Sequence, residues 1–376
     1  MSWMDGPPHN SRVKRFLVVG GYGGAGRPLC RLLLAQTDSE VVVAGRDIQK
    51  AREFAKTLGE GAEALAVDVR DPSSLRQALP GIDMLVLAAA VAQSIGDIAR
   101  TTLDSGVDFL DILYPASRVP LLRALEPEVV RSGRILITEA GAHPGMASAL
   151  VRYAGCRMDR VNRAIVAGLM NLDLREHEIG SSDSLSELVE SLRDTKPLVF
   201  RDGAWRNPGW KSEKIDFGPR FGQKPCVFME AAELEGLPET MGLSEAGFCV
   251  AGFNPFVDYL VMPLGLAIAR WKWGVRLTAR LLRWGLERFS KPPWGMVWKL
   301  EALGEKDGRP AMLEVFVRHP DGYFLTAAPV VACIRQYFDG TIPPGLHMMG
   351  WAVEPARFLS DLRDMGVEVE EKGLSP

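Results

Sequence analysis

A glycine-rich loop near the N-terminus places the strongest constraint on how this chain can fold. Gly21-Tyr22-Gly23-Gly24-Ala25-Gly26 has the spacing G-x-G-x-x-G and follows the apolar run Phe16-Leu17-Val18-Val19. Such a run is typical of a parallel strand buried on both faces, and Leu29, Leu32 and Leu33 beyond the loop share one face of a helix. The three glycines permit a tight turn, a close approach to a pyrophosphate and helix–strand packing. The loop therefore predicts a dinucleotide site at a helix N-terminus.

Further strand and helix signals alternate along the first third of the chain. Helical segments include 48–58 and one that begins at Asp71-Pro72, where proline suits the first turn. The apolar runs that indicate buried strands between them lie at 41–44, 64–67, 84–87, 109–110 and 134–137. This alternation predicts an α/β fold, with residues 13–142 forming a Rossmann domain whose parallel sheet is doubly wound.

The pattern changes after Gly145. Longer strand signals at 198–200, 226–228 and 312–316 are separated by turns rich in glycine and proline. Residues 143–326 are therefore expected to form an α+β substrate domain. The final stretch, Ala352 to Val369, has the pattern of a helix, a turn and a short strand, which we expect to return to the first domain.

The end of the second strand discriminates between the two nicotinamide cofactors. An NAD site places a carboxylate there to bind the ribose 2′-hydroxyl. This chain instead has Arg46, twenty residues after Gly26, and a guanidinium can bind a 2′-phosphate bidentately. Lys50 adds a second positive charge, whereas Asp47 is the alternative that would serve the ribose of NAD. We predict NADP rather than NAD.

Two later segments complete the predicted cofactor site. Asp68-Val69 follows the third strand and is placed to meet the adenine ring, while Ala88-Ala89-Ala90 follows the fourth strand and is small enough for the dinucleotide to cross the sheet. Small residues at a strand end are also common packing choices. The predicted cofactor residues are Gly21, Tyr22, Gly23, Gly24, Ala25, Gly26, Arg46, Lys50, Asp68, Val69, Ala88, Ala89 and Ala90.

With these residues established, the chain resembles the saccharopine dehydrogenase-like NADP-binding oxidoreductases. The resemblance extends over most of residues 13–370, although each short motif is unspecific. The segments that carry it are Phe16–Gly26 with Val41–Arg46, Gly106–Asp111, Glu139–Met146, Val199–Trp205 and Tyr323–Ala327.

The resemblance implies an architecture and a reaction. It implies that 327–376 complete the Rossmann domain, that 143–326 form an inserted substrate and dimerisation domain with a mixed sheet, and that the protein is a homodimer. The reaction it implies is reversible reduction of an imine formed between an amino acid and an oxo-acid. We therefore expect hydride transfer at a C–N or C=N centre of a small amino-acid-derived substrate.

Three residues are candidates for the chemistry. Asp111 and Tyr114 follow the fifth strand, at the carboxyl edge of the sheet where ligands bind. Tyr114 can orient the nicotinamide, and Asp111 can alternatively cap the next segment. His143 can titrate near neutral pH as an acid or base, but a histidine beside Pro144-Gly145 is also a common structural turn residue.

Composition excludes several classes of protein. A net charge of −3 offers no cationic excess for nucleic acid. The five cysteines are scattered without a C-x-x-C pair, so neither a disulfide framework nor a metal site is predicted. The first fourteen residues lack the apolar segment of a secretory signal, and the apolar run 255–269 is too short to span a bilayer. We expect a cytoplasmic protein without a transmembrane segment.

The segment 270–298 has two interpretations. Arg276, Arg280 and Arg283 fall on one stripe of a helix, opposite an apolar face, with several tryptophans nearby. Such a helix can lie on an anionic membrane surface. Alternatively, it packs on its own domain or at a dimer interface, with its arginines in solvent.

Two further functions remain open at this point. One is a membrane-surface reductase of an apolar or lipid substrate, motivated by the segment 270–298. The other is a sensor or scaffold that binds NADP without turnover, because the sequence contains no unmistakable acid–base pair.

Overall fold

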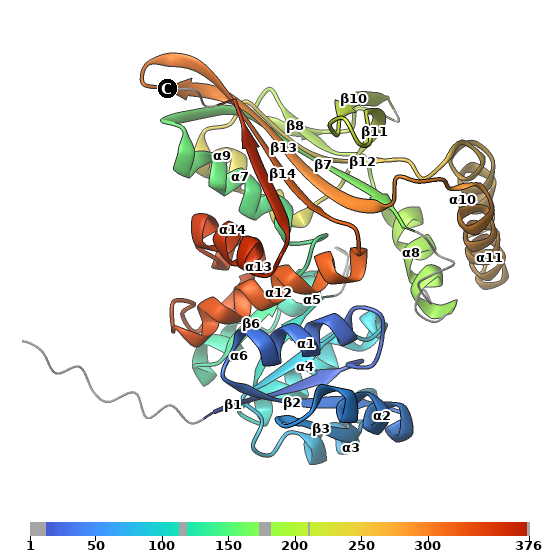
Figure 1. The fold of residues 1–376 in the computed structure, drawn as a ribbon, viewed down its shortest axis with the longest axis vertical. Coiled ribbons are helices and arrows are strands. Elements are labelled where there is room, and N and C mark those ends of the chain that lie inside the picture. The colour runs from blue at the N-terminus through green and yellow to red at the C-terminus, as the bar shows by residue number, and fades with distance from the viewer. Residues whose placement is uncertain (1–12, 113–118, 173–181, 210, 374–376) are drawn as a thin grey trace, which may run out of the picture.

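The computed structural model describes residues 13–112, 119–172, 182–209 and 211–373. Two β-sheets organise these residues, one in the lower and one in the upper half of Figure 1. The lower sheet has seven strands, and all of its pairings are parallel. Its strands are β1 (Lys14–Val19), β2 (Ser39–Gly45), β3 (Ala62–Ala66), β4 (Met84–Leu87), β5 (Asp108–Asp111), β6 (Ile135–Thr138) and β15 (Gly345–Met348).

The strand order β15-β6-β5-β4-β1-β2-β3 is that of a doubly wound sheet. Its helices are α1 (Gly26–Gln36), α2 (Ile48–Leu58), α3 (Pro72–Ala78), α4 (Ile95–Asp104), α5 (Val119–Arg123) and α6 (Glu126–Ser132). Successive residues of β1 enter two different cores, because side chains alternate across a strand. Phe16 and Val18 pack in the core that contains α1 and α2, whereas Leu17 and Val19 pack with α3 and α4. The continuous apolar run of β1 thus reflects burial on both faces, and the predicted Rossmann fold is confirmed.

The upper sheet has nine strands and is mixed. β7 and β12 are parallel, and the remaining pairings are antiparallel. Helix α7 (Met146–Arg157) packs against β7 and β13 and shares their core. The strands are β7 (Arg160–Asn171), β8 (Val199–Arg201), β9 (Ala204–Arg206), β10 (Ser212–Asp216), β11 (Gln223–Met229), β12 (Glu245–Ala251), β13 (Gly295–Lys306), β14 (Arg309–His319) and β16 (Glu368–Lys372).

The C-terminal segment contributes to both sheets. β15 adds to the edge of the parallel sheet beside β6, whereas β16 pairs with β14 in the mixed sheet. The expectation that the last strand returns to the first domain is therefore wrong, since the register of β16 follows β14. The helices of this segment are α12 (Gly322–Phe338), which packs on α1, α13 (Met349–Ala352) and α14 (Pro355–Asp364).

A helical unit lies at the side of the molecule, away from the seven-stranded sheet (Figure 1). A small core of its own joins α8 (Ser182–Asp194), a π-helical turn η4 (Val257–Val261), α10 (Met262–Ile268) and α11 (Lys272–Phe289). Within the described part of the chain, no helix combines the length and apolar character needed to cross a bilayer.

A buried hydrogen bond attaches α12 to the parallel sheet. The Tyr337 hydroxyl donates to Asp108 Oδ2 at 2.8 Å, and the amide of Ile135 donates to Asp108 Oδ1 at 2.9 Å. We predict that Tyr337→Phe lowers the free energy of unfolding by about 1–3 kcal/mol, because it leaves a buried carboxylate oxygen without its donor. Urea denaturation measures this loss. Tyr259→Phe, at a side chain that is 78% exposed, is the matched control, and equal stability of the two variants would contradict the prediction.

Candidate cofactor and active site

The turn after β1 passes very close to the end of β4. Gly20 has φ +81°, and a Cβ there would lie 2.6 Å from the carbonyl oxygen of Ala88. The Gly20 amide donates to Ala44 O at 2.8 Å, and the Ala88 amide donates to Val19 O at 2.8 Å. Gly20 precedes the G-x-G-x-x-G motif, and the sequence analysis missed it. Gly20 and Ala88 become neighbours only when β1 and β4 pair in the sheet.

The other glycines of the loop divide into positions that pack beneath the loop and positions that line the cleft. A Cβ on Gly26 would collide with the carbonyl oxygen of Gly20, so α1 can pack this closely only with glycine there. Gly23 and Gly24 line the cleft above the loop. Ala25, the N-cap of α1, provides no side-chain acceptor to the first turn. In this turn the Arg27 amide donates to Gly23 O at 3.0 Å and Pro28 has no N–H. The helix dipole is therefore the main feature that favours an anion at this end.

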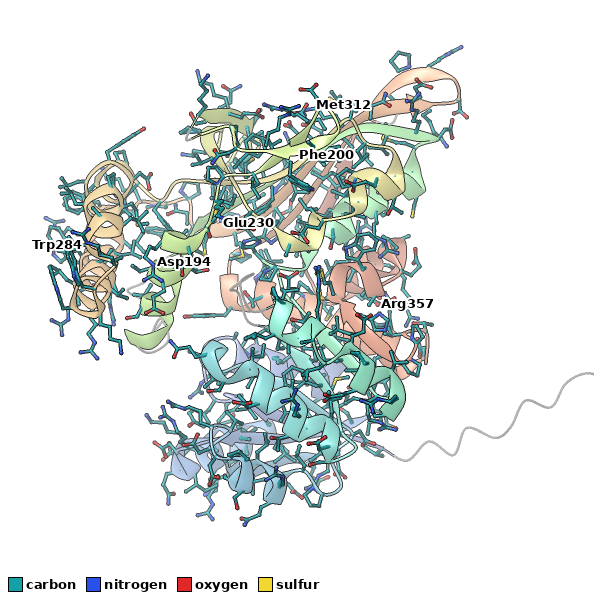
Figure 2. All side chains as sticks on the ribbon, turned by 180° about the vertical axis from the view of Figure 1, so that it is seen from behind. Asp194, Phe200, Glu230, Trp284, Met312 and Arg357 are labelled. Atoms are coloured by element: carbon teal, nitrogen blue, oxygen red, sulfur yellow. The ribbon has the colours of Figure 1, made fainter. Side chains whose placement is uncertain are left out.

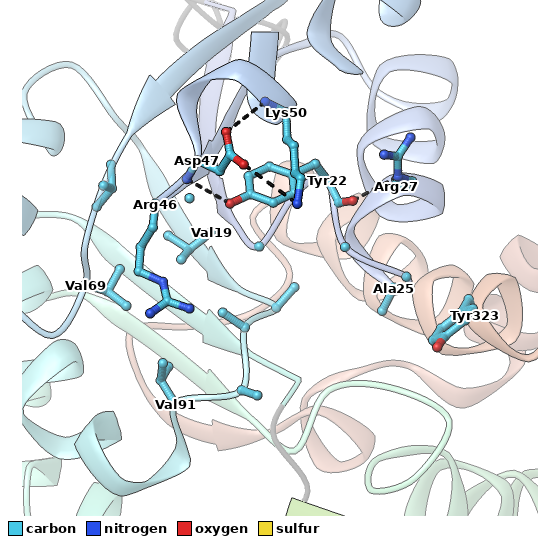
Figure 3. A pocket seen from close by; sticks show the side chains of 18 of the residues that line it. Val19, Tyr22, Ala25, Arg27, Arg46, Asp47, Lys50, Val69, Val91 and Tyr323 are labelled. Carbon is cyan, nitrogen blue, oxygen red and sulfur yellow. Dashed lines mark hydrogen bonds and ion pairs between the residues drawn. The ribbon is translucent and has the colours of Figure 1, made fainter. Parts of the chain in front are cut away.

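Tyr22 connects this loop to the next strand. A Cβ on Gly45 would lie 2.6 Å from the Tyr22 ring, so the ring packs directly on the end of β2. The Tyr22 hydroxyl accepts a hydrogen bond from the amide of Asp47 at 3.1 Å (Figure 3). Arg27 Nε donates to the carbonyl oxygen of Tyr22 at 2.8 Å. Tyr22 thus positions the β2–α2 corner relative to the glycine loop.

At this corner, a carboxylate and a guanidinium have separate roles. Asp47 is the N-cap of α2, since its Oδ1 accepts from the amides of Gln49 and Lys50 at 3.1 and 3.2 Å. Its Oδ2 also lies 3.7 Å from Lys50 Nζ. Arg46 is the first residue after β2, and its side chain extends into the pocket toward Val91 (Figure 3). The carboxylate is engaged with the helix, and the guanidinium faces the cleft.

The cleft has a volume of about 2120 Å³, and most of the predicted cofactor residues line it. All of them line it except Gly21 and Gly26, which pack beneath the loop. Val69 is 6% exposed and borders the cleft. Asp68 borders it too, although its Oδ1 accepts the amide of Arg70 at 3.1 Å.

Residues far along the chain close the other side of this cleft. Tyr323 of α12 packs against Gly24, where a Cβ would lie 2.6 Å from the ring. Asp321 caps α12 through the amides of Tyr323 and Phe324, at 2.8 and 3.2 Å. Arg283 of α11 also lines the cleft. In the sequence, Tyr323 stands out only as part of a family segment, because no local pattern reveals contact with a loop some three hundred positions earlier.

The candidates for the chemistry lie elsewhere. Asp111 ends β5 and is fully buried, and its carbonyl oxygen accepts the amide of Ala140 at 3.1 Å. Tyr114 lies outside the described residues. The His143 ring stacks on Phe248 at 4.3 Å and meets Trp298 edge-on at 6.0 Å. Neither Asp111 nor His143 is among the residues that line the cleft.

Two buried glutamates that the sequence did not predict, Glu139 and Glu233, lie close to each other, and the charge of Asp111 also acts on Glu139. Glu139 follows β6 with φ 53° and is 2% exposed. Burial, with the charges of Glu233 and Asp111, raises the pKa of Glu139 well above its usual value. Glu233 accepts from the amides of Gly145 and Ser148, both at 2.8 Å, and thereby caps α7. Burial raises the pKa of Glu233, although these hydrogen bonds oppose the shift.

Comparison with known proteins identifies the relatives of this architecture. Residues 16–137 match the family model of the saccharopine dehydrogenase NADP binding domain. A curated relative, the NADP(+)-dependent, L-glutamate-forming saccharopine dehydrogenase of Saccharomyces cerevisiae, is 30% identical over 151 residues. This match covers 40% of the chain but spans only about a third of that relative's length (32%).

A solved structure shows the same fold over nearly the whole chain. The apo saccharopine dehydrogenase (L-Glu forming) from Saccharomyces cerevisiae superposes with a TM-score of 0.71 at 17% sequence identity. The superposition covers 96% of this chain and 100% of that one. The parallel sheet and the mixed sheet are therefore arranged as in that structure.

The buried His143 ring makes stability depend on pH. Both ring nitrogens are buried, and burial lowers the pKa of His143 from 6.5 to about 3. Below pH 6.5 the unfolded chain binds a proton at this residue and the folded chain does not, so stability falls as the pH falls toward 3. We predict that wild type loses up to about 2 kcal/mol more than His143→Gln between pH 7 and pH 5.

Urea denaturation of wild type, His143→Gln and a control variant at pH 7 and pH 5 measures this difference in stability. His347→Gln, on β15, is the control and should keep the pH dependence of wild type. Equal losses for wild type and His143→Gln would show that the ring is protonated in the folded protein.

Proposed function

We propose, on the premise that residues 16–137 form an NADP-binding domain of the saccharopine dehydrogenase family, that this protein is an NADP-dependent oxidoreductase. Its proposed reaction is hydride transfer at a C–N or C=N centre of a small amino-acid-derived substrate. The observation that carries the proposal is the β2–α2 corner. There the Asp47 carboxylate caps α2, and Arg46 faces the cleft.

The residues of the cleft fit the parts of NADP. The start of α1 suits the pyrophosphate, because no side chain caps the first turn and the helix dipole favours an anion there. Gly23 lines the cleft and has no side chain, so a phosphate could approach its backbone closely. Arg46 and Lys50 would hold the 2′-phosphate, and Val69 would contact the adenine. When bound, the nicotinamide supplies or accepts the hydride.

The substrate is proposed from chemistry shared with the relatives. The curated relative is, by its name, an NADP(+)-dependent enzyme that forms L-glutamate. Hydride transfer at a C–N centre needs a site beyond the nicotinamide that orients the amine and manages its proton. We assign this role to the ends of β5 and β6, with Asp111, Tyr114 and His143 as the candidate residues. His143 would act as a neutral hydrogen-bonding group, because burial lowers its pKa to about 3.

We also propose the division into two units and the assembly that the resemblance implies. Residues 13–142 with parts of 327–376 would form the cofactor unit, and 143–326 the substrate unit. The protein would be a homodimer that contacts its partner through residues 143–326.

The role of Arg46 can be tested by cofactor binding. We predict that Arg46→Ala weakens NADPH binding about 10- to 100-fold and leaves NADH binding within about twofold, because only the former offers a 2′-phosphate for a charge-assisted hydrogen bond. Fluorescence titration with both cofactors measures the two affinities. Arg52→Ala, at an exposed arginine of α2 outside the cleft lining, controls for long-range charge. If Arg52→Ala lost as much NADPH affinity as Arg46→Ala, or if Arg46→Ala weakened NADH binding equally, a specific contact between Arg46 and the 2′-phosphate would be contradicted.

The reaction can be tested by oxidation of NADPH. We predict turnover when an oxo-acid and an amino acid are supplied together and none with either alone, because the imine forms only from the pair. Absorbance at the reduced-nicotinamide band across a panel of pairs measures this activity. If the protein binds NADPH but oxidises it with none of the pairs, the sensor or scaffold function would be favoured over catalysis.

A further inference from the structure

Exposed hydrophobic side chains are concentrated on the helical unit at the side of the molecule. Among the described residues, nine of the fourteen large hydrophobic side chains classed as exposed fall within residues 259–289. The other five are scattered over both sheets and their helices. The nine are Tyr259, Leu260, Leu264, Trp271, Trp273, Leu277, Leu281, Trp284 and Phe289. Such a concentration of exposed apolar side chains on one unit is typical of an interaction site.

Packing within the chain explains only one face of α11. Val275, Ala279 and Leu282 are buried in a small core with α8 and η4. This face accounts for the interpretation of α11 as a helix packed on its own domain. It leaves a second stripe uncovered, in which residues 273, 277, 281 and 284 recur at helical spacing and are 40–57% exposed.

A row of cations runs beside this apolar stripe. Arg276, Arg280 and Arg283 are exposed and also recur every three or four positions. Glu287, the sole acidic residue of α11, pairs with Arg283 at 2.8 Å. Arg270 and Lys272 add positive charge at the start of the helix, where the Arg270 guanidinium lies 3.8 Å from the centre of the Trp271 ring. The uncovered face of α11 thus combines tryptophan, leucine and net positive charge.

The helices beneath this face pack closely against α11. A Cβ on Gly265 would collide with Thr278, and a Cβ on Gly274 would collide with the backbone of Ile268. A Cβ on Gly285 would lie 2.8 Å from Val257. Glycine at these crossings therefore lets α11 pack tightly on α10 and η4. The unit lies at the outer edge of the molecule, with Trp284 at its margin (Figure 2). A flat external surface can reach this face without displacing the sheets.

We propose that α11 and α10 dock on the surface of an anionic lipid bilayer. Tryptophan and leucine would enter the interfacial region, while the flanking arginines would extend their charged ends toward lipid phosphates. A second copy of this chain fits less well, because a twofold contact sets the same face against itself and opposes the two arginine rows. The inference does not rest on the proposed reaction. Since Arg283 also lines the cofactor cleft, docking brings that cleft close to the bilayer.

Vesicle flotation of the full chain tests this proposal. We expect wild type to float with vesicles of phosphatidylcholine mixed with phosphatidylglycerol, and not with phosphatidylcholine alone. Arg276→Gln/Arg280→Gln should weaken partitioning about thirtyfold, from the loss of two cations near an anionic surface. Trp273→Ser/Leu277→Ser/Leu281→Ser should abolish flotation. Leu303→Ser/Met312→Ser, at side chains of the β13–β14 hairpin that are 40% and 44% exposed, is the matched control and should float like wild type.

Circular dichroism establishes that each variant is folded, and sedimentation analysis reports its oligomeric state. Failure of wild type to float with anionic vesicles at physiological salt would overturn the proposal, as would equal flotation of folded α11 variants and wild type. A dimer that Trp273→Ser/Leu277→Ser/Leu281→Ser dissociates, without vesicle binding by wild type, would assign this face to a second copy of the chain instead.

Discussion

The cofactor half of this protein depends on the close approach of the first turn to the ends of two neighbouring strands. Gly20 lies against Ala88 after β4, and its amide donates to Ala44 in β2. A side chain at Gly20 or Gly26 would collide with backbone, so this close approach of the turn and the start of α1 requires glycine at both positions. Tyr22 then ties this turn to the β2–α2 corner, where Arg46 leaves the strand. In the proposed function, this approach of the backbone would set where the pyrophosphate and the 2′-phosphate are held.

Helix α12, far along the chain, contacts this site. Tyr323 at the start of α12 packs on Gly24, while Tyr337 near its end donates to Asp108 at the start of β5. One helix therefore contacts both the glycine loop and the sheet beneath it. Beyond the cleft, Glu233 caps α7 and lies close enough to Glu139 to raise the pKa of that residue. These buried carboxyls make the region near β5 and β6 electrostatically distinct from the cationic β2–α2 corner.

The two faces of α11 have different surroundings. Val275 and Leu282 pack within the domain, as an ordinary amphipathic helix would. Trp273 and Trp284 remain exposed beside the arginine row, although burial of such rings is worth several kcal/mol in general. A helix that satisfies only its internal packing would not need aromatic side chains in solvent, which is why an external surface is the simplest partner.

The sequence by itself determined the Rossmann fold, the glycine loop and the position of Arg46. Each of these follows from local periodicity or from a short spacing, since apolar runs mark buried parallel strands and the loop lies directly between strand and helix. Tertiary structure decided the rest. The return of β15 to the parallel sheet, the pairing of β16 with β14, Tyr323 on Gly24 and Glu233 at the start of α7 all join residues far apart in the chain. Such contacts depend on how whole elements pack, and no local pattern of residue types encodes them.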